Sequence, residues 1–219
     1  MEEFESFSLS LHPQDSQEWK DLHSGKITAS NFAAAVGNSE FDKPEEIAER
    51  IKSNKEKEFD PEAVKRMNHG KEMEPTARSW YSTHTNCLIK QVGLAVFKKN
   101  PKIGASPDGV ILDGDGKWQG IIEIKCPKKM YVSYLQISKI IGEDSSGRKI
   151  LAADEFEVAF IFKNHFDQMM GSLHILNLPF CDYIVYSEEH ILVHRIYYDE
   201  EYSAKLFSDL ENFINKYEI

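Results

Sequence analysis

The chain reads SPDGVILDGDGKWQGIIEIKCP over residues 106–127, and this stretch decides the fold. Two segments, 108–112 and 120–124, have the length and the β-branched composition of strands. Between them, residues 113–117 contain two Asp-Gly dipeptides, which are typical of a tight turn between antiparallel strands. The stretch therefore predicts a β-hairpin that begins at Asp108 and returns through Ile124.

The predicted hairpin brings three ionisable side chains together. Glu123 and Lys125 are two residues apart, so they project from the same face of their strand, about 6.5–7 Å from each other. Fourteen residues separate Asp108 from Glu123, and a turn centred on Asp115 and Gly116 places the two acids opposite each other. Their Cβ atoms are then about 4.5–5.5 Å apart.

Two carboxylates that face each other repel unless a proton or a cation lies between them. A divalent cation removes the repulsion, and hard oxygen ligands favour Mg²⁺, with Mn²⁺ as a substitute. Such an ion polarises a phosphoryl oxygen and activates a bound water, while Lys125 orients that water or stabilises the developing charge. A lone Asp-Gly or Glu-x-Lys is usually a turn or a surface ion pair. Their combination beside the buried run Ile121–Ile122 indicates a metal site suited to phosphate-ester hydrolysis.

Two helices are expected near the N-terminus. The first covers 28–36, with Thr28 as its cap and Gly37 near its end. Its amino end is suited to an anion. The second begins at Pro44, and the polar run 52–58 that follows is expected to be a solvated linker.

A longer helix is expected to begin at Pro61, with Asp60 as its N-cap. Seven-residue steps from Met67 reach Glu74 and then Tyr81, which places the three side chains on one face of the helix. Because this face is predicted to be the apolar one, we expect Glu74 on a buried stripe.

Strands and helices alternate in the rest of the chain. The expected elements are one or two strands within 87–97, a helix or irregular segment after Pro127, a polar loop over 142–149, a strand over 156–162, a helix over 164–176, a hairpin of 183–186 with 191–197, and a last helix over 199–217 capped by Asp199. This order predicts a mixed α/β or α+β fold with a mostly antiparallel sheet. We expect one domain over 1–219, with a helical part over about 1–86, a sheet core over about 87–198 and a C-terminal helix over about 199–217.

The composition is that of an ordinary globular protein, with 41% hydrophobic and 28% charged residues. The apolar runs fall far short of the roughly 20 residues of a membrane span. The acidic N-terminus, Met1–Glu5, lacks the basic and apolar regions of a secretory signal, which predicts an intracellular protein of the cytoplasm or nucleus. The three cysteines, Cys87, Cys126 and Cys181, are widely spaced and are expected to be reduced thiols.

The formal net charge of -10 opposes binding to nucleic acid, because phosphate binding depends on a cationic surface. Carboxylates that hold a metal ion lower the formal charge, and the bound ion restores positive potential at the site. A DNA-contacting surface is therefore expected to be a local patch, for example around Lys125, Lys128 and Lys129.

Four motifs occur in order along the chain. They are Trp19 followed by Gly25-Lys26-Ile27-Thr28-Ala29-Ser30, then Gly70-Lys71-Glu72-Met73-Glu74, then Ser106-Pro107-Asp108-Gly109, and then Glu123-Ile124-Lys125-Cys126-Pro127. Together they resemble the phage lambda exonuclease and YqaJ-like viral recombinase group of the PD-(D/E)xK nuclease superfamily. The resemblance covers most of the chain, and it implies a restriction-endonuclease-like core in which a central mixed β-sheet is flanked by helices.

The resemblance implies a role for each matching residue of the predicted metal site. Asp108 and Glu123 would ligate Mg²⁺ together with the backbone carbonyl of Ile124. Lys125 would be the catalytic lysine, and Glu74 would be a further catalytic acid near the metal.

Five further residues are expected to contact DNA or to assist the site. By resemblance, Ser30 would bind the terminal phosphate, and His23 stands where the family pattern has an arginine, as a weaker and pH-dependent cation. Gln168 keeps the first of two glutamines in the family's downstream helix and would position the water or the lysine. Lys128 and Lys129, just past the metal motif, would contact the DNA backbone.

The resemblance implies a Mg²⁺-dependent DNA exonuclease that acts on duplex ends, from 5′ to 3′, in recombination or DNA-end processing. It also implies a homotrimer and a single-strand annealing protein as partner. Two alternatives are an endonuclease on the same core and a non-catalytic nucleic-acid-binding module that has kept the fold. An iron–sulfur nuclease of the same superfamily is disfavoured, because three scattered cysteines do not supply a four-thiolate cluster.

Overall fold

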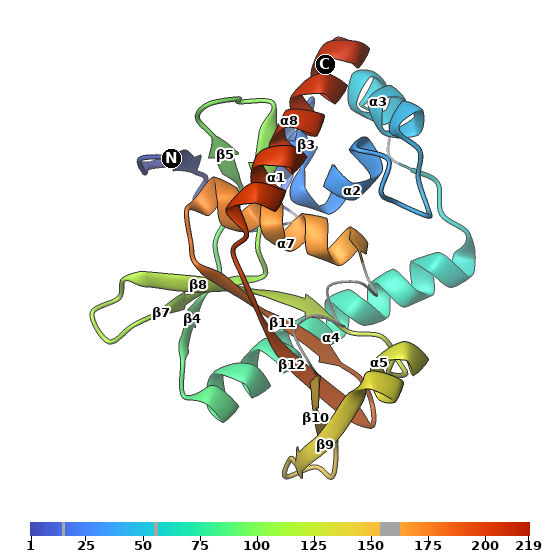
Figure 1. Cartoon of the computed structure of the whole chain (residues 1–219), viewed down its shortest axis with the longest axis vertical. Helices are drawn as coiled ribbons and strands as arrows, with labels where there is room; N and C mark the ends of the chain where they lie inside the picture. Colours follow the sequence, from blue (N-terminus) through green and yellow to red (C-terminus); the bar gives the residue numbers. More distant parts are fainter. Residues whose placement is uncertain (15, 55–56, 154–162) are drawn as a thin grey trace.

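The computed structural model describes residues 1–14, 16–54, 57–153 and 163–219, and in these residues the strands form a seven-stranded and a five-stranded sheet (Figure 1). The helices are α1 (Gln17–His23), the 3₁₀ helix η1 (Ala29–Asn31), α2 (Phe32–Ala35), α3 (Pro44–Ser53), α4 (Pro61–Thr85), α5 (Val132–Ile137), α7 (Lys163–Leu176) and α8 (Glu200–Tyr217). The strands are β1 (Glu2–Glu3), β2 (Phe7–Leu9), β3 (Ile27–Thr28), β4 (Leu88–Lys90), β5 (Ala95–Phe97), β6 (Ile103–Ala105), β7 (Gly109–Leu112), β8 (Trp118–Lys125), β9 (Ser138–Glu143), β10 (Lys149–Ala153), β11 (Phe180–Tyr186) and β12 (His190–Tyr197).

The seven-stranded sheet has the order β4-β7-β8-β11-β12-β10-β9. β7 and β8 form the predicted antiparallel hairpin, with Gly109 opposite Ile122, so Asp108 and Glu123 are neighbours at the end of this ladder. Gly116 has a φ of 78° in the connecting turn, a backbone conformation that favours glycine. β8 and β11 are parallel, as are β10 and β12, so the sheet is mixed as expected.

Helices cover both faces of this sheet. Ile122 and Ile124 belong to a buried cluster beneath α4, whereas Ile121 belongs to the main core, which includes α7. Because side chains alternate along a strand, Glu123 and Lys125 project toward the α7 side with Ile121. Figure 1 shows α7 between the sheet and a group of helices, α2, α3 and α8, at the other end of the molecule.

The five-stranded sheet has the order β1-β2-β5-β6-β3 and was not predicted. The part over 1–86, expected to be helical, contributes three of its strands, and the region over 87–198 contributes β5 and β6. Each of these strands has only two or three residues. Strands this short carry too few residues for a recognisable alternation of polar and apolar side chains.

One local prediction was wrong. The expected helix over 28–36 is a strand end, a 3₁₀ turn and a single short α-helix, and Thr28 makes no capping bond through its side chain. Most of the expected polar loop over 142–149 is a turn, residues 144–148, but the two strands that it joins, β9 and β10, were not predicted. β9 is an edge strand with exposed side chains, including Ile140 and Ile141, so it lacks a buried face that would mark it in the sequence. The predicted strand over 156–162 lies outside the described residues.

The long helix α4 begins as predicted, with the Asp60 carboxylate accepting a hydrogen bond from the Ala63 amide (2.9 Å). Tyr81 is buried, but Met67 is 45% exposed, so the predicted stripe is buried only in the C-terminal half of the helix. The reason is geometric, because the N-terminal half of α4 projects beyond the sheet (Figure 1). Glu74 lies between the two halves and is partly buried.

The remaining predicted elements are confirmed. α3 begins at Pro44, α7 covers the expected 164–176, and β11 and β12 form the expected hairpin. α8 is capped by Asp199, whose carboxylate accepts from the Tyr202 amide (2.9 Å). In the ranges described above, the helices are all too short or too polar to cross a membrane.

The contact between α7 and α2 leaves no room for a side chain at Gly171. A Cβ there would lie 2.3 Å from two ring carbons of Phe32, which is fully buried. We expect Gly171→Ala to lower the free energy of unfolding by about 1–3 kcal/mol, because the core would be overpacked. Gly70→Ala in α4 is the matched control, since nothing lies within 4 Å of a Cβ at that position. The control should be neutral or stabilising by up to about 1 kcal/mol. Urea unfolding measures both, and equal effects would contradict the packing argument.

Candidate active site

The carboxylate of Asp108 is fixed by the backbone of the neighbouring strand. Its Oδ2 accepts a hydrogen bond from the Ile124 amide at 2.6 Å. Asp108 directly precedes β7, so its carboxylate reaches an amide of β8 in place of a strand-to-strand bond. This contact holds Asp108 beside the segment that carries Glu123.

Glu123 and Lys125 lie on the same face of β8 and form an ion pair. Lys125 Nζ donates to Glu123 Oε1 at 2.7 Å and to Gln168 Oε1 of α7 at 3.2 Å. The Glu123 side chain is 3% exposed and that of Lys125 is 24% exposed. The structure therefore brings Asp108, Glu123 and Lys125 together as the sequence predicted, and it adds Gln168 as a direct partner of the lysine.

Burial and like charges perturb the ionisation of this cluster. Burial, followed by the charges of Glu123 and Glu74, raises the pKa of Asp108 well above its usual value. Burial acts to lower the pKa of Lys125, but the charges of Glu123 and Asp108 leave that pKa raised. The site therefore combines an acid that resists ionisation with a lysine that stays protonated.

Arg78 of α4 was missed by the sequence analysis. Its Nε donates to the main-chain carbonyl of Asp108 at 2.9 Å, and its guanidinium pairs with Glu74. The four-residue spacing of Glu74 and Arg78 on a helix was a visible signal for their pairing. Their contact with Asp108 depends on where α4 crosses the sheet, which the spacing does not reveal.

Residues near the N-terminus form hydrogen bonds with the two residues that precede Asp108. Gln14 Nε2 donates to the Pro107 carbonyl at 3.1 Å, and Trp19 Nε1 donates to Ser106 Oγ at 3.4 Å. Gln14 and Trp19 therefore hold the residues just before Asp108. Asp108 itself is hydrogen-bonded to α4 and to β8.

A buried hydroxyl network lies behind the ion pair. Tyr183 is paired with Glu123 in the register of β8 and β11, and its hydroxyl is hydrogen-bonded to Tyr134 (3.3 Å) and to His165 (2.7 Å). Burial, together with the charge of Lys125, lowers the pKa of His165 to about 3, so this histidine is neutral. His165 is three residues before Gln168 on α7. The network therefore attaches α7, which carries Gln168, to β11.

The donor set fits a hard divalent cation. Asp108 and Glu123 offer carboxylate oxygens, and the carbonyl of Ile124 lies between Glu123 and Lys125 in the chain. Within the described ranges, no group of three or more acids, histidines or cysteines is arranged to hold a metal ion, and Glu74 is paired with Arg78. An ion at this site would therefore be held by two carboxylates with main-chain, water and substrate oxygens, as is common for Mg²⁺.

The predicted DNA-contacting residues come from separate elements of the chain. Ser30 is exposed in η1, with its Oγ 3.4 Å from Thr28 Oγ1. His23 stacks on Trp19, with ring centroids 3.5 Å apart. Lys128 and Lys129 are exposed between β8 and α5. Gln168, by contrast, lies at the acid site itself.

Comparison with known families gives one match. Residues 18–174 match the YqaJ-like viral recombinase domain, a range that contains the four motifs and Gln168. The match confirms the resemblance drawn from those motifs. No curated protein matches the sequence.

Solved structures share the fold. An alkaline exonuclease from Laribacter hongkongensis has 22% sequence identity and a TM-score of 0.69, with 93% of each chain covered. Its complex with dAMP gives a TM-score of 0.70 at the same identity and coverage. A phage-related exonuclease from Haemophilus somnus 129PT has 16% identity and a TM-score of 0.57, covering 90% of this chain and 95% of the other. These similarities confirm the mixed sheet flanked by helices.

The raised pKa of Asp108 predicts a cost in stability that depends on pH. An aspartate whose folded pKa exceeds its unfolded value destabilises the fold as the pH rises above about 3.9. In EDTA, we expect Asp108→Asn to raise the free energy of unfolding at pH 7 by more than the roughly 0.5 kcal/mol typical of surface substitutions. The gain should disappear below about pH 3.9, where both states are protonated.

Urea unfolding at a series of pH values measures this effect. Asp115→Asn is the control, because Asp115 is exposed in the turn of the same hairpin. A loss of stability in Asp108→Asn at pH 7, or a gain that persists at low pH, would contradict the assigned cause of the pKa shift.

Proposed function

Because the chain belongs to the YqaJ-like viral recombinase domain family, we propose that it is a metal-dependent DNA exonuclease that hydrolyses phosphodiester bonds at duplex ends. We further propose 5′ to 3′ polarity and a role in recombination or DNA-end processing. The solved structures with this fold include two enzymes described as exonucleases, one of them also in complex with dAMP, and a mononucleotide is what an exonuclease releases.

The observation that carries this proposal is the arrangement of Asp108, Glu123 and Lys125. The two acids are neighbours on adjoining strands, and the lysine is bonded to one of them. If the site were only the Lys125–Glu123 ion pair, the Asp108 carboxylate would still lie near the charges of Glu123 and Glu74, which raise its pKa. A bound dication would remove that cost, which supports a metal ion as the partner of the two acids at this point of the sheet.

In the proposed mechanism, Asp108, Glu123 and the Ile124 carbonyl would hold Mg²⁺, and the bound ion would supply Lewis-acid chemistry for the hydrolysis of a phosphate ester. Lys125 stays protonated between Glu123 and Gln168, so its ammonium is available to stabilise negative charge on the phosphoryl oxygens. Gln168 fixes the direction of the ammonium group.

Arg78 has a positioning role in the same proposal. It bonds the Asp108 carbonyl and the Glu74 carboxylate at once, so it keeps Glu74 near the acid pair and limits the rotation of the Asp108 backbone. Glu74 would be a further acid near the metal, since its charge acts on Asp108. Ser30 and His23 would contact the terminal phosphate, Lys128 and Lys129 the backbone of DNA.

End-labelled DNA tests the activity. We expect the wild-type protein to degrade linear duplex DNA with Mg²⁺ or Mn²⁺ but not with EDTA, and to release a 5′ label as mononucleotide before a 3′ label. Lys125→Ala should lower the rate on the order of 10²-fold or more, because it removes a charge that stabilises the transition state. Lys117→Ala is the control, since Lys117 is an exposed lysine in the turn of the same hairpin.

Each other outcome of this assay has a definite meaning. Cleavage of covalently closed circles would identify an endonuclease. If the protein binds DNA but does not cleave it with any divalent metal tested, it is a binding module and the enzyme proposal is wrong.

Metal binding is tested separately by thermal or urea unfolding. At Mg²⁺ concentrations near 100 times its dissociation constant, the wild type should gain about 2.7 kcal/mol of unfolding free energy. Asp108→Asn should lose most of this gain, whereas Asp115→Asn should keep it. An equal response of the two variants to Mg²⁺ would show that the ion binds elsewhere.

A further inference from the structure

Two neighbouring residues of β11 attach different helices to the sheet. In the parallel register of β11 and β8, Asp182 is paired with Ile122 and Tyr183 with Glu123. Because neighbouring side chains of a strand project to opposite faces, Asp182 lies on the α4 side with Ile122, and Tyr183 lies on the α7 side with Glu123. Both residues are buried. The strand next to β8 therefore offers one polar side chain to each of the two helices that flank the acid site.

Asp182 holds α4 through Tyr81. The Tyr81 hydroxyl donates to the Asp182 carboxylate, and Arg195 of β12 donates to both oxygens of that carboxylate, at 2.7 and 2.8 Å. Tyr81 is buried and lies three residues after Arg78, whose Nε donates to the Asp108 carbonyl. A buried, hydrogen-bonded carboxylate accepts donors in a few fixed directions, whereas apolar contacts allow a helix to shift. The Asp182–Tyr81 bond therefore sets where Arg78 meets the Asp108 backbone.

Tyr183 holds α7 through His165. The Tyr134 hydroxyl donates to the Tyr183 oxygen, so the proton of Tyr183 is directed at His165 Nδ1, 2.7 Å away. Burial, together with the charge of Lys125, lowers the pKa of His165 to about 3, so the ring is neutral and its Nδ1 is an acceptor. Gln168 follows three residues later on α7 and accepts from Lys125. The Tyr183–His165 bond therefore sets how far Gln168 lies from Lys125.

A second bond of the same kind holds the other end of α7. His174, near the C-terminus of this helix, is bonded through Nδ1 to the Tyr198 hydroxyl at 2.8 Å. The helix rises by about 13 Å between His165 and His174, at 1.5 Å per residue. The two bonds thus share their chemistry, but only the one at His165 lies beside the partner of the lysine. Comparison of the two separates the positioning of the acid site from the general docking of α7.

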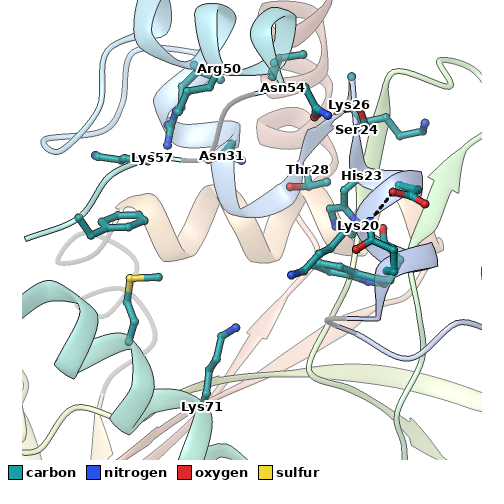
Figure 2. Close-up of a pocket in the computed structure, with 18 residues that line it drawn as sticks. Lys20, His23, Ser24, Lys26, Thr28, Asn31, Arg50, Asn54, Lys57 and Lys71 are labelled. Atoms are coloured by element: carbon teal, nitrogen blue, oxygen red, sulfur yellow. Dashed lines mark hydrogen bonds between the residues drawn. The ribbon is translucent and has the colours of Figure 1, made fainter. Parts of the chain in front are cut away.

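These side chains are set back from the proposed DNA surface. The cleft between the N-terminal elements and α4 has a volume of about 1030 Å³ and contains His23, a proposed DNA contact (Figure 2). In the ranges that the structure describes, its lining includes no residue of α7 or β11, and Tyr81 is not part of it either. A role of Asp182 and Tyr183 in the reaction would therefore act through the helices that they hold.

We propose that Asp182 and Tyr183 are positioning residues for the acid site. Through α4, the first aligns the arginine that bonds Asp108. Through α7, the second aligns the glutamine that bonds Lys125. The inference rests on the proposed function for the reaction that the site performs. The alignment itself is a property of the metal-free protein, so it is measurable without DNA or Mg²⁺.

Tyr183→Phe tests the α7 side. In EDTA, the bonds from Lys125 to Glu123 and Gln168 slow the exchange of the ammonium protons with water, which the nitrogen NMR signal of this lysine reports. In Tyr183→Phe that exchange should be about fivefold faster or more, because Gln168 is no longer held in one place. With Mg²⁺ and DNA, kcat should fall about tenfold or more. KM should stay unchanged, because the lost bond lies outside the cleft.

Tyr81→Phe tests the α4 side. The Ile124 amide donates to Asp108 Oδ2 at 2.6 Å, so its hydrogen exchange reports how firmly Asp108 is held. In EDTA, we expect this amide to exchange about fivefold faster or more in Tyr81→Phe, with the exchange of the Lys125 ammonium unchanged. Tyr183→Phe should show the reverse, with the Ile124 amide unchanged. In Tyr81→Phe, kcat should again fall about tenfold or more at an unchanged KM.

Tyr198→Phe is the matched control, since it removes the same kind of bond from the other end of α7. It should leave both exchange rates, kcat and KM as in the wild type. Urea unfolding checks that the three variants are folded, and Tyr81→Phe leaves Asp182 with both bonds from Arg195. If Tyr183→Phe does not fold, His165→Leu removes the same bond from a partly buried position and has the same expected results.

The outcomes separate this inference from the proposed function. If either variant changes the exchange rates no more than Tyr198→Phe does, or if both variants speed both exchanges equally, Asp182 and Tyr183 are not positioning residues. Wild-type kcat despite faster exchange would make the two bonds structural only and would also overturn the inference. If each variant changes only its own exchange rate while no divalent metal supports cleavage by the wild type, the alignment stands and the nuclease proposal is wrong.

Discussion

The proximity of the Asp108 and Glu123 carboxylates is the constraint on which the rest of the structure depends. Two acids on adjoining strands of a half-buried sheet repel each other, and burial makes their ionisation costly. The fold stabilises this arrangement with fixed donors: the Ile124 amide bonds to Asp108, and Lys125 bonds to Glu123. These hydrogen bonds offset part of the free-energy cost of burying two like charges. In the proposed function, a bound dication would offset more of it.

The elements around the acid pair have distinct tasks. α4 covers one face of the sheet and delivers Arg78 to the Asp108 backbone. α7 covers the other face and delivers Gln168 to Lys125, and the Tyr183–His165 bond anchors that helix to β11. Because the two helices approach from opposite faces, the acid pair and the lysine are held from both sides of β8. Such support is what a preorganised site requires.

The N-terminal elements lie across a cleft from α4. Trp19 and Gln14 hydrogen-bond to Ser106 and Pro107, just before Asp108, and Phe7 of β2 stacks on Trp118 of β8. The lysines and arginines that line this cleft come from α1, α3 and α4 and from the segments that hold Lys26 and Lys57. Lysines and arginines are thereby concentrated in one cleft of a protein whose formal net charge is -10.

The sequence by itself determined the hairpin and the convergence of Asp108, Glu123 and Lys125, because two-residue periodicity and Asp-Gly turns act over short distances along the chain. The family followed from the resemblance of four motifs that stand in order along the chain. Only the tertiary structure decided that Arg78 bonds Asp108, 30 residues away, and that Gln168 bonds Lys125, 43 residues away. It also brought Lys20, Arg50 and Lys71, which are far apart in the sequence, to the lining of one cleft. Local sequence patterns determine which face of a helix or strand is polar. The packing of α3, α4 and α7 determines which other residues that face contacts.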